Sequence, residues 1–340
     1  MKNKEGKTIR TDFNPIYQID KLISKGKKID LNDTILIAGS PRSGTTWLME
    51  IFENIPGYTY LFEPLQPEWF PDSIKAGFKG RPYIPENQSF QDGEKYLKKI
   101  FSGQIVSQIP PYSYNAKMTI NRLLNKKLIV KSVRLNRSLP WIHNKFKLRK
   151  IIFIIRHPCA VIDSQLKTGF TGYHEYQPPY QNRFPTKKEI IAEASNIDIL
   201  DKTLIKRLEK IKKLEEMLAA CWCLDNYIPL YKLNSEKWNI VIYEKLMTDG
   251  ESIIKYLFNE IGEKNTIDLA IRFLNKPSML TLGKDPKRGI NTNIQLSKWK
   301  KSLSSDKIKL ILSLVEDFGF DFYTEKIEPD YANIRFKIIK

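Results

Sequence analysis

The segment Gly39-Ser-Pro-Arg-Ser-Gly-Thr-Thr46 has the residue types and spacing of a loop that binds an anionic group. It follows the short apolar run Thr34–Ala38, which is typical of a buried parallel strand, and a helix is predicted after it, from Thr45 or Thr46 to Glu53. At such a junction, backbone N–H groups and the positive end of the helix dipole converge on a bound anion. The segment therefore predicts a phosphate-binding loop.

The same loop differs from the one that nucleotide kinases and NTPases use. Their pattern, Gly-x4-Gly-Lys-Ser/Thr, supplies a Lys for the β- and γ-phosphates and a hydroxyl for magnesium. Here Thr45 stands at the position of that Lys, and Arg42 lies inside the loop. A P-loop nucleotide kinase or NTPase is therefore an alternative interpretation, which predicts magnesium-dependent ATP binding.

A second segment, Ile155–Ser164, joins another predicted strand to another predicted helix. Arg156 would stand at the carboxyl end of the strand, Pro158 would open the helix, and Ser164 follows Arg156 by eight residues. A guanidinium fork and a hydroxyl in this arrangement can reach one phosphate. Because open α/β sheets bind ligands at the carboxyl ends of their strands, both segments are predicted to face one site.

These two segments resemble the nucleotide-binding motifs of the sulfotransferases that use PAPS (3′-phosphoadenosine 5′-phosphosulfate). Pro41–Leu48 is similar to the family's 5′-phosphosulfate loop, and Arg156 with Ser164 is similar to the pair that holds the 3′-phosphate. More loosely, Asp285–Asn291 followed by Lys298-Trp-Lys300 resembles the family's C-terminal basic loop. The resemblance, which runs from about Thr34 to Phe320, implies PAPS as donor, PAP as product and no required metal. The nucleotide-binding residues that it implies are Arg42, Ser43, Gly44, Thr45, Thr46, Trp47, Arg156, Ser164, Arg288 and Gly289.

Two further segments, Leu61–Leu65 and Val130–Arg134, look most like the carbohydrate 6-O-sulfotransferase branch. Glu63 ends the second predicted strand next to the loop, and the likeness also places a Glu here, so Glu63 is the candidate base for an acceptor hydroxyl. Arg42 and Lys131 are its expected catalytic partners, and Arg134 is an expected acceptor-binding residue. Glu63 in a plain ion pair with Arg42 or Arg134 is the rival interpretation. Of the three histidines, only His174 is kept as a reserve base.

Apolar runs separated by predicted helices predict an α/β fold: a P-loop-type, three-layer α/β/α arrangement with a central parallel sheet. The expected strands are Thr34–Ala38, Tyr58–Phe62, Leu128–Lys131, Ile151–Ile155 and Asn239–Tyr243, and one long helix is expected over Asp201–Leu230. We expect an N-terminal arm (1–32), a single sulfotransferase domain (33–325) with insertions at about 64–115 and 168–235, and a C-terminal tail (326–340).

The 340 residues carry a formal net charge of +18, which favours anionic partners. A basic nucleic-acid-binding protein is a third interpretation, but the Lys and Arg residues are spread along the chain, and we expect no nucleic-acid partner. The polar start lacks an apolar signal segment, no run is long enough to span a membrane, and the cysteines number three. A cytoplasmic enzyme is expected, whose acceptor is a glycan or another hydroxyl-bearing small molecule.

Overall fold

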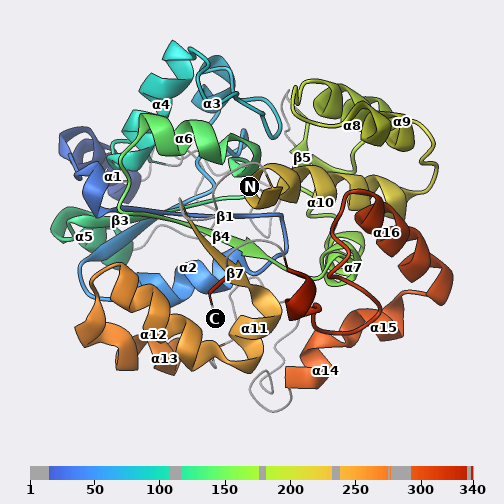
Figure 1. Ribbon diagram of the computed structural model, residues 1–340. Helices are drawn as coiled ribbons and strands as arrows, with labels where there is room; N and C mark the ends of the chain where they lie inside the picture. The colour runs from blue at the N-terminus through green and yellow to red at the C-terminus, as the bar shows by residue number, and fades with distance from the viewer. Residues whose placement is uncertain are drawn as a thin grey trace, which may run out of the picture.

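The computed structural model describes residues 15–106, 116–175, 181–231, 238–274, 276, 292–334 and 338–339. Its centre is a five-stranded sheet with the order β2-β3-β1-β4-β7, in which every neighbouring pair is parallel (Figure 1). The strands are β1 (Thr34–Gly39), β2 (Tyr58–Phe62), β3 (Lys127–Ser132), β4 (Lys150–Ile155) and β7 (Asn239–Ile242). All five strands that the sequence predicts are confirmed.

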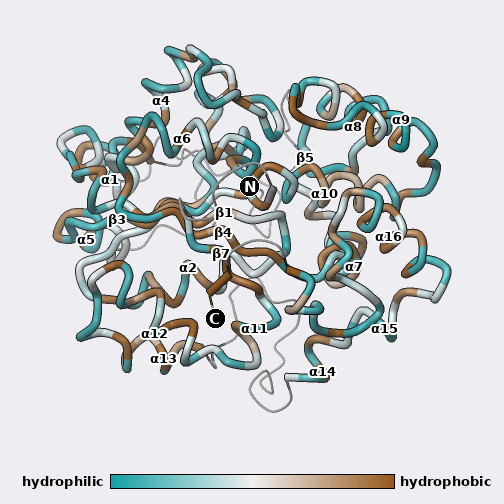
Figure 2. Tube along the Cα trace, in the orientation of Figure 1, coloured by the Kyte–Doolittle hydropathy of each residue, from teal (hydrophilic) through white to brown (hydrophobic). Residues whose placement is uncertain are grey.

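Alternate residues of each strand face opposite layers of helices, because successive side chains of a strand point to opposite faces. Leu36 and Ala38 of β1 join one apolar cluster, whereas Ile35 and Ile37 join another. Figure 2 shows the hydrophobic colouring concentrated along the strands at the centre of the molecule. The first cluster includes α6 (Leu139–Lys145), α7 (Pro158–Thr168), α10 (Leu214–Tyr231) and α16 (Ser305–Asp317). The second includes α2 (Thr45–Glu53), α11 (Tyr243–Thr248), α12 (Gly250–Glu260) and α13 (Ile267–Leu274). The predicted three-layer α/β/α fold is confirmed.

The register of the strands brings their carboxyl ends to one edge of the sheet. Gly39 of β1 pairs with Ile154 of β4, and Phe62 of β2 pairs with Lys131 of β3. Ile155 at the end of β4 pairs with Ile242 at the end of β7. The loops that follow these strands therefore start side by side, as the sequence predicts for its two nucleotide motifs.

Smaller elements surround this centre. Near β2 and β3 lie α1 (Pro15–Gly26), α3 (Asp72–Lys75), α4 (Gln91–Phe101) and α5 (Ala116–Leu124) (Figure 1). On the other side lie α8 (Lys187–Ser195), α9 (Lys202–Leu208), α14 (Thr292–Leu296) and α15 (Lys298–Ser302). A two-stranded antiparallel pair, β5 (Tyr173–His174) with β6 (Asn182–Arg183), stands apart from the main sheet.

The predicted single helix over Asp201–Leu230 is wrong, because the chain forms α9 and α10 with a break between them. In the break, the backbone N–H groups of Lys212 and Lys213 both donate to the Glu216 carboxylate at 2.9 Å, which caps the start of α10. Ile211 of the break is fully buried. Its apolar side chain continues the helical spacing, and no Gly or Pro marks the interruption, so the sequence carries no sign of it.

The expected N-terminal arm contains the helix α1, which the sequence did not predict. Its buried positions are Tyr17, Asp20 and Ser24, of which two are polar, whereas the apolar Ile19 and Leu22 are exposed. Asp20 pairs with Arg122 of α5 at 2.9 Å, and both side chains are buried. Among the described residues, no helix has the length and the apolar composition needed to cross a membrane.

A buried ion network allows a test of the fold. Asp225 of α10 is fully buried between Arg81 and Arg137, and the Arg137 Nη2 atom lies 3.1 Å from its carboxylate. We expect Asp225→Asn to lower the free energy of unfolding by about 3–5 kcal/mol, because it leaves buried guanidinium charge uncompensated. Urea denaturation measures this loss. The control Asp72→Asn, which breaks an exposed pair with Lys75, should cost about 0–1 kcal/mol. Equal losses in free energy of unfolding for the two variants would contradict a stabilising role of the buried Asp225 network.

Candidate active site

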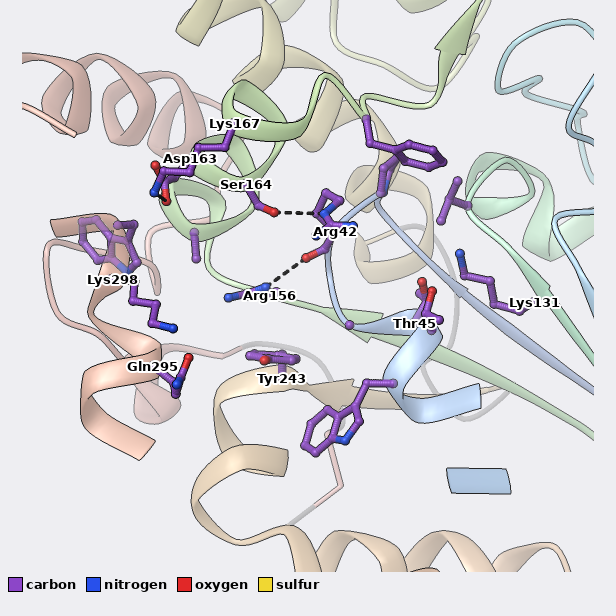
Figure 3. Close-up of a pocket in the computed structure, with 18 residues that line it drawn as sticks. Arg42, Thr45, Lys131, Arg156, Asp163, Ser164, Lys167, Tyr243, Gln295 and Lys298 are labelled. Carbon is purple, nitrogen blue, oxygen red and sulfur yellow. Dashed lines mark hydrogen bonds and ion pairs between the residues drawn. The ribbon is translucent and has the colours of Figure 1, made fainter. Parts of the chain in front are cut away.

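A cavity of about 230 Å³ opens at the carboxyl edge of the sheet, where the loop after β1 enters α2 (Figure 3). Basic side chains outnumber acidic ones in its lining by five to one. The five basic residues are Arg42, Lys131, Arg156, Lys167 and Lys298, and the acidic one is Asp163. A cavity with this lining attracts an anionic ligand.

The loop after β1 is held in shape by its neighbours. The Ser43 N–H donates to the Ser40 carbonyl at 3.1 Å, and the Gln165 side chain donates to the Pro41 carbonyl at 3.1 Å. Both Arg42 (φ 74°) and Gly44 (φ 96°) have left-handed backbone conformations. A Cβ atom at Gly44 would lie 2.5 Å from the Tyr243 ring, so the glycine permits a close approach of α11 to the loop.

Arg42, Ser164 and Arg156 form one connected group at the centre of the cavity (Figure 3). The Arg42 Nε atom donates to the Ser164 Oγ atom at 2.9 Å, and Arg156 Nη1 donates to the Arg42 carbonyl at 3.1 Å. The Arg156 guanidinium also lies 4.2 Å from the centroid of the Tyr243 ring. The structure thus brings together the residues of the two nucleotide motifs, which lie more than a hundred positions apart in the chain.

Glu63, Lys131 and Arg134 form a second, deeper group. Glu63 is fully buried, and its Oε1 atom lies 2.5 Å from Lys131 Nζ. Both carboxylate oxygens accept from the Val133 N–H at 3.2 Å, and Arg134 Nη1 lies 3.4 Å from Oε2. Lys131 lines the cavity, whereas Glu63 and Arg134 do not. Lys131 therefore stands between the Glu63 carboxylate and the cavity.

The backbone of Glu63 and the environment of Lys131 are both unusual. Glu63 has φ 47°, a left-handed conformation that is rare for a residue with a side chain, and its N–H donates to the Lys131 carbonyl at 2.8 Å. Burial lowers the pKa of Lys131, while the Glu63 carboxylate opposes that shift. The fold thus fixes the carboxylate of Glu63 against a desolvated ammonium group.

Several expected site residues have other positions. The Ser43 side chain is buried and does not line the cavity, whereas Gly44, Thr45, Thr46 and Trp47 do. Arg288 and Gly289 lie outside the described residues. The reserve base His174 is buried beside Gln66, with 3.1 Å between the His174 Nδ1 and Gln66 Nε2 atoms, and is not a lining residue.

The sequence did not identify part of the lining. Tyr243 directly follows β7, as Arg156 directly follows β4, so its position at the end of a strand is the sequence signal that marks it. Asp163, one residue before Ser164, accepts from Lys167 Nζ and from the Ser302 hydroxyl, each at 2.6 Å. The other lining residues that were not named as site residues are Pro41, Val133, Ala160, Lys167, Phe170, Gln295, Lys298 and Trp299. The described chain contains no group of three or more His, Cys, Asp or Glu residues that could hold a metal ion.

Two comparisons give matches. The model of the Sulfotransferase family matches residues 34–266, more than half of the chain. The sulfotransferase domain of the Synechococcus PCC 7002 olefin synthase is 18% identical over 84% of this chain and 94% of that one, with a TM-score of 0.42. Mouse sulfotransferase SULT7A1, solved in complex with PAP, is 13% identical over 88% and 89%, also with a TM-score of 0.42.

A third solved structure, the sulfotransferase domain from the curacin biosynthetic pathway, is 16% identical over 84% of this chain and 96% of that one, with a TM-score of 0.40. Comparison with the curated proteins gives no match. The family match spans β1 to β7 and therefore includes the loop after β1 and the Arg156–Ser164 segment.

The close approach of the loop to α11 generates a prediction. In Gly44→Ala, the new Cβ atom would meet the Tyr243 ring at 2.5 Å, so the loop or the ring, both of which line the cavity, must shift. We expect PAP binding, measured by isothermal titration calorimetry, to weaken at least about tenfold, which is ~1.4 kcal/mol. The control is Gly57→Ala, which also has a positive φ (88°) but has no atom within 4 Å of the new Cβ. It should bind PAP as the wild type does. An unchanged affinity in Gly44→Ala would contradict this role of the loop.

Proposed function

The chain belongs to the sulfotransferase family, and from this membership we propose that it transfers a sulfonate group from PAPS to a hydroxyl or amine acceptor. The observation that carries the proposal is the arrangement of cationic groups in one cavity. Arg156 and Ser164 form one cluster, Lys131 of β3 and Thr45 at the start of α2 line another part of the same cavity, and Arg42 of the loop after β1 is hydrogen-bonded to the first cluster (Figure 3). A donor with separate 3′-phosphate and 5′-phosphosulfate groups needs two such anion-binding regions.

The proposed reaction is an in-line displacement at sulfur. The acceptor oxygen or nitrogen forms a bond to sulfur as the bond between sulfur and the bridging oxygen of the donor breaks. The leaving group is PAP, and the acceptor's proton passes to a base. As in phosphoryl transfer, positioning and electrostatic stabilisation of the leaving oxygen supply most of the catalysis. The loop N–H groups, Arg42 and Lys131 are the groups of this chain that would stabilise that oxygen.

We assign Glu63 as the base and Lys131 as the residue that contacts the leaving oxygen. In the described conformation the two side chains bind each other at 2.5 Å, with Lys131 on the cavity side. When the donor is bound, Lys131 would turn toward the bridging oxygen and uncover the Glu63 carboxylate for the acceptor hydroxyl. Arg134 Nη1 donates to Glu63 Oε2 at 3.4 Å, and Arg134 Nη2 donates to the Gly172 carbonyl at 3.1 Å. Arg134 thus connects the proposed base to the segment after α7.

The proposed acceptor is a carbohydrate hydroxyl, on a free glycan or a glycolipid. Support comes from the likeness of Leu61–Leu65 and Val130–Arg134 to the carbohydrate branch, since both segments meet where Glu63 and Lys131 pair. Aromatic rings lie close by: the Phe62 ring centroid is 4.5 Å from Lys131 Nζ and 5.7 Å from the Trp69 ring. Phe62 is buried, so the partly exposed Trp69 ring is the one that would face the apolar side of a sugar ring.

The test is transfer of labelled sulfonate from PAPS to a panel of sugars, glycolipids and phenols. The wild type is compared with Glu63→Gln, which lacks the proposed base. We expect transfer to a sugar acceptor, and Glu63→Gln should lower kcat by a factor of 10² to 10⁴, the usual contribution of a general base. PAP affinity and the melting temperature, measured alongside, separate lost chemistry from lost folding. Glu94→Gln, at a partly exposed carboxylate of α4, is the control and should keep full activity.

Two outcomes would contradict the proposal in different ways. If the protein binds PAP but transfers sulfonate to no acceptor in the panel, the proposed donor site stands and the proposed acceptor class is wrong. If a folded Glu63→Gln variant keeps full activity, the assignment of Glu63 as the base is wrong, although sulfonate transfer itself stands.

A further inference from the structure

The neighbouring helices α1 and α5 expose most of the large apolar side chains on the described surface. Eight large hydrophobic residues are exposed among the described residues, and five of them belong to these two short helices. They are Ile19 (50% exposed), Leu22 (68%), Ile120 (52%), Leu123 (57%) and Leu124 (67%), here called the aliphatic face. Single exposed apolar residues are ordinary, but a concentration of them marks an interaction surface.

Polar contacts hold the two helices side by side. Asp20 of α1 pairs with Arg122 of α5 at 2.9 Å, and both side chains are buried. Just after α1, Lys27 Nζ donates to the carbonyls of Leu123 and Asn125 at 3.1 and 2.5 Å. The C-terminal ends of the two helices therefore lie together. This geometry brings Leu22, in the last turns of α1, to the same end as Leu123 and Leu124 of α5.

Lysines surround the aliphatic face. Lys21 and Lys25 are exposed on α1, and Lys28 and Lys126 are exposed just after the two helices. Because Asp20 is buried in its pair with Arg122, no described acidic side chain of α1 or α5 is exposed. The nearest described exposed carboxylate in the chain is Asp30, four residues after α1, which accepts from the Asn32 N–H. Partial burial lowers the pKa of Lys27, and the positive charges of Arg122 and Lys126 lower it further, which shows that cationic groups gather here.

We propose that the aliphatic face docks on a membrane surface that contains anionic lipids. Leu and Ile side chains on one side of a helix, with lysines around them, fit the boundary between lipid headgroups and acyl chains. The lysines would meet the anionic headgroups, to which each contributes about a factor of five in affinity. A second copy of this chain is a poorer fit, because a twofold contact would bring the same lysines together without an exposed carboxylate on either helix.

The docked molecule would keep its active site open to water. In Figure 1, α1 and α5 lie together at one end of the molecule, whereas α7, α14 and α15, which contribute to the cavity, lie at the other end. The surface and the cavity are thus separate, and binding of PAP should not change when vesicles are present. The proposal does not depend on which acceptor the enzyme uses.

The experiment is co-sedimentation of the full chain with vesicles of phosphatidylcholine alone or of phosphatidylcholine mixed with phosphatidylglycerol. We expect the wild type to pellet with the mixed vesicles and to stay in solution with phosphatidylcholine alone. Leu22→Gln combined with Leu123→Gln should weaken the binding at least about tenfold, as should Lys21→Glu combined with Lys25→Glu. All four side chains are exposed, so the variants should keep the wild-type melting temperature.

The matched control is Lys202→Glu with Lys206→Glu on α9, two exposed lysines with the same spacing and the same change in net charge. Tyr256→Gln on α12 is the control for the apolar change. Both controls should bind vesicles as the wild type does. The proposal is overturned if the wild type fails to pellet with the mixed vesicles, or if the α9 control loses as much binding as the α1 variant. It is also overturned if light scattering shows a dimer that Leu22→Gln with Leu123→Gln dissociates.

Discussion

The parallel arrangement of five strands is the constraint on which the site depends. Because all the strands end at one edge, the residues that follow them meet there: the loop after β1, Glu63 after β2, Val133 after β3, Arg156 after β4 and Tyr243 after β7. These residues are far apart in the chain, and local interactions alone would not bring them together. The helices on both faces bury the sheet and hold this edge in place.

Positive charge is concentrated at the carboxyl edge of the sheet, and neighbouring side chains partly compensate for it. Arg42, Lys131 and Arg156 line one cavity, so their positive charges repel one another. The Tyr243 ring faces the Arg156 guanidinium, and the buried Glu63 carboxylate holds Lys131. An anionic ligand would complete the compensation inside the cavity. The same contacts that stabilise the cationic groups also fix their positions relative to one another.

Much of this site could be predicted from the sequence, because its key residues lie at the ends of strands. Buried parallel strands appear as short apolar runs, and their ends locate Arg42, Glu63 and Arg156 at one edge without further information. The depth of each residue could not be predicted: Glu63 and Lys131 both follow the strand pattern, and only packing decides that Lys131 faces the cavity. Lys298 and Trp299 of α15 lie in the segment that resembles the family's C-terminal basic loop, whereas Gln295 reaches the cavity from α14 without any local pattern that marks it.

The central claim is that the cavity binds PAPS and not a nucleoside triphosphate with magnesium. The most direct measurement is thermal unfolding with PAP, PAPS or ATP with magnesium, for the wild type and for Arg156→Ala. A ligand at a hundred times its dissociation constant stabilises the folded state by about 2.7 kcal/mol, which raises the melting temperature measurably. We expect PAP and PAPS to stabilise the wild type, ATP with magnesium to have no effect, and Arg156→Ala to abolish the response. Stabilisation by ATP with magnesium alone would contradict the account.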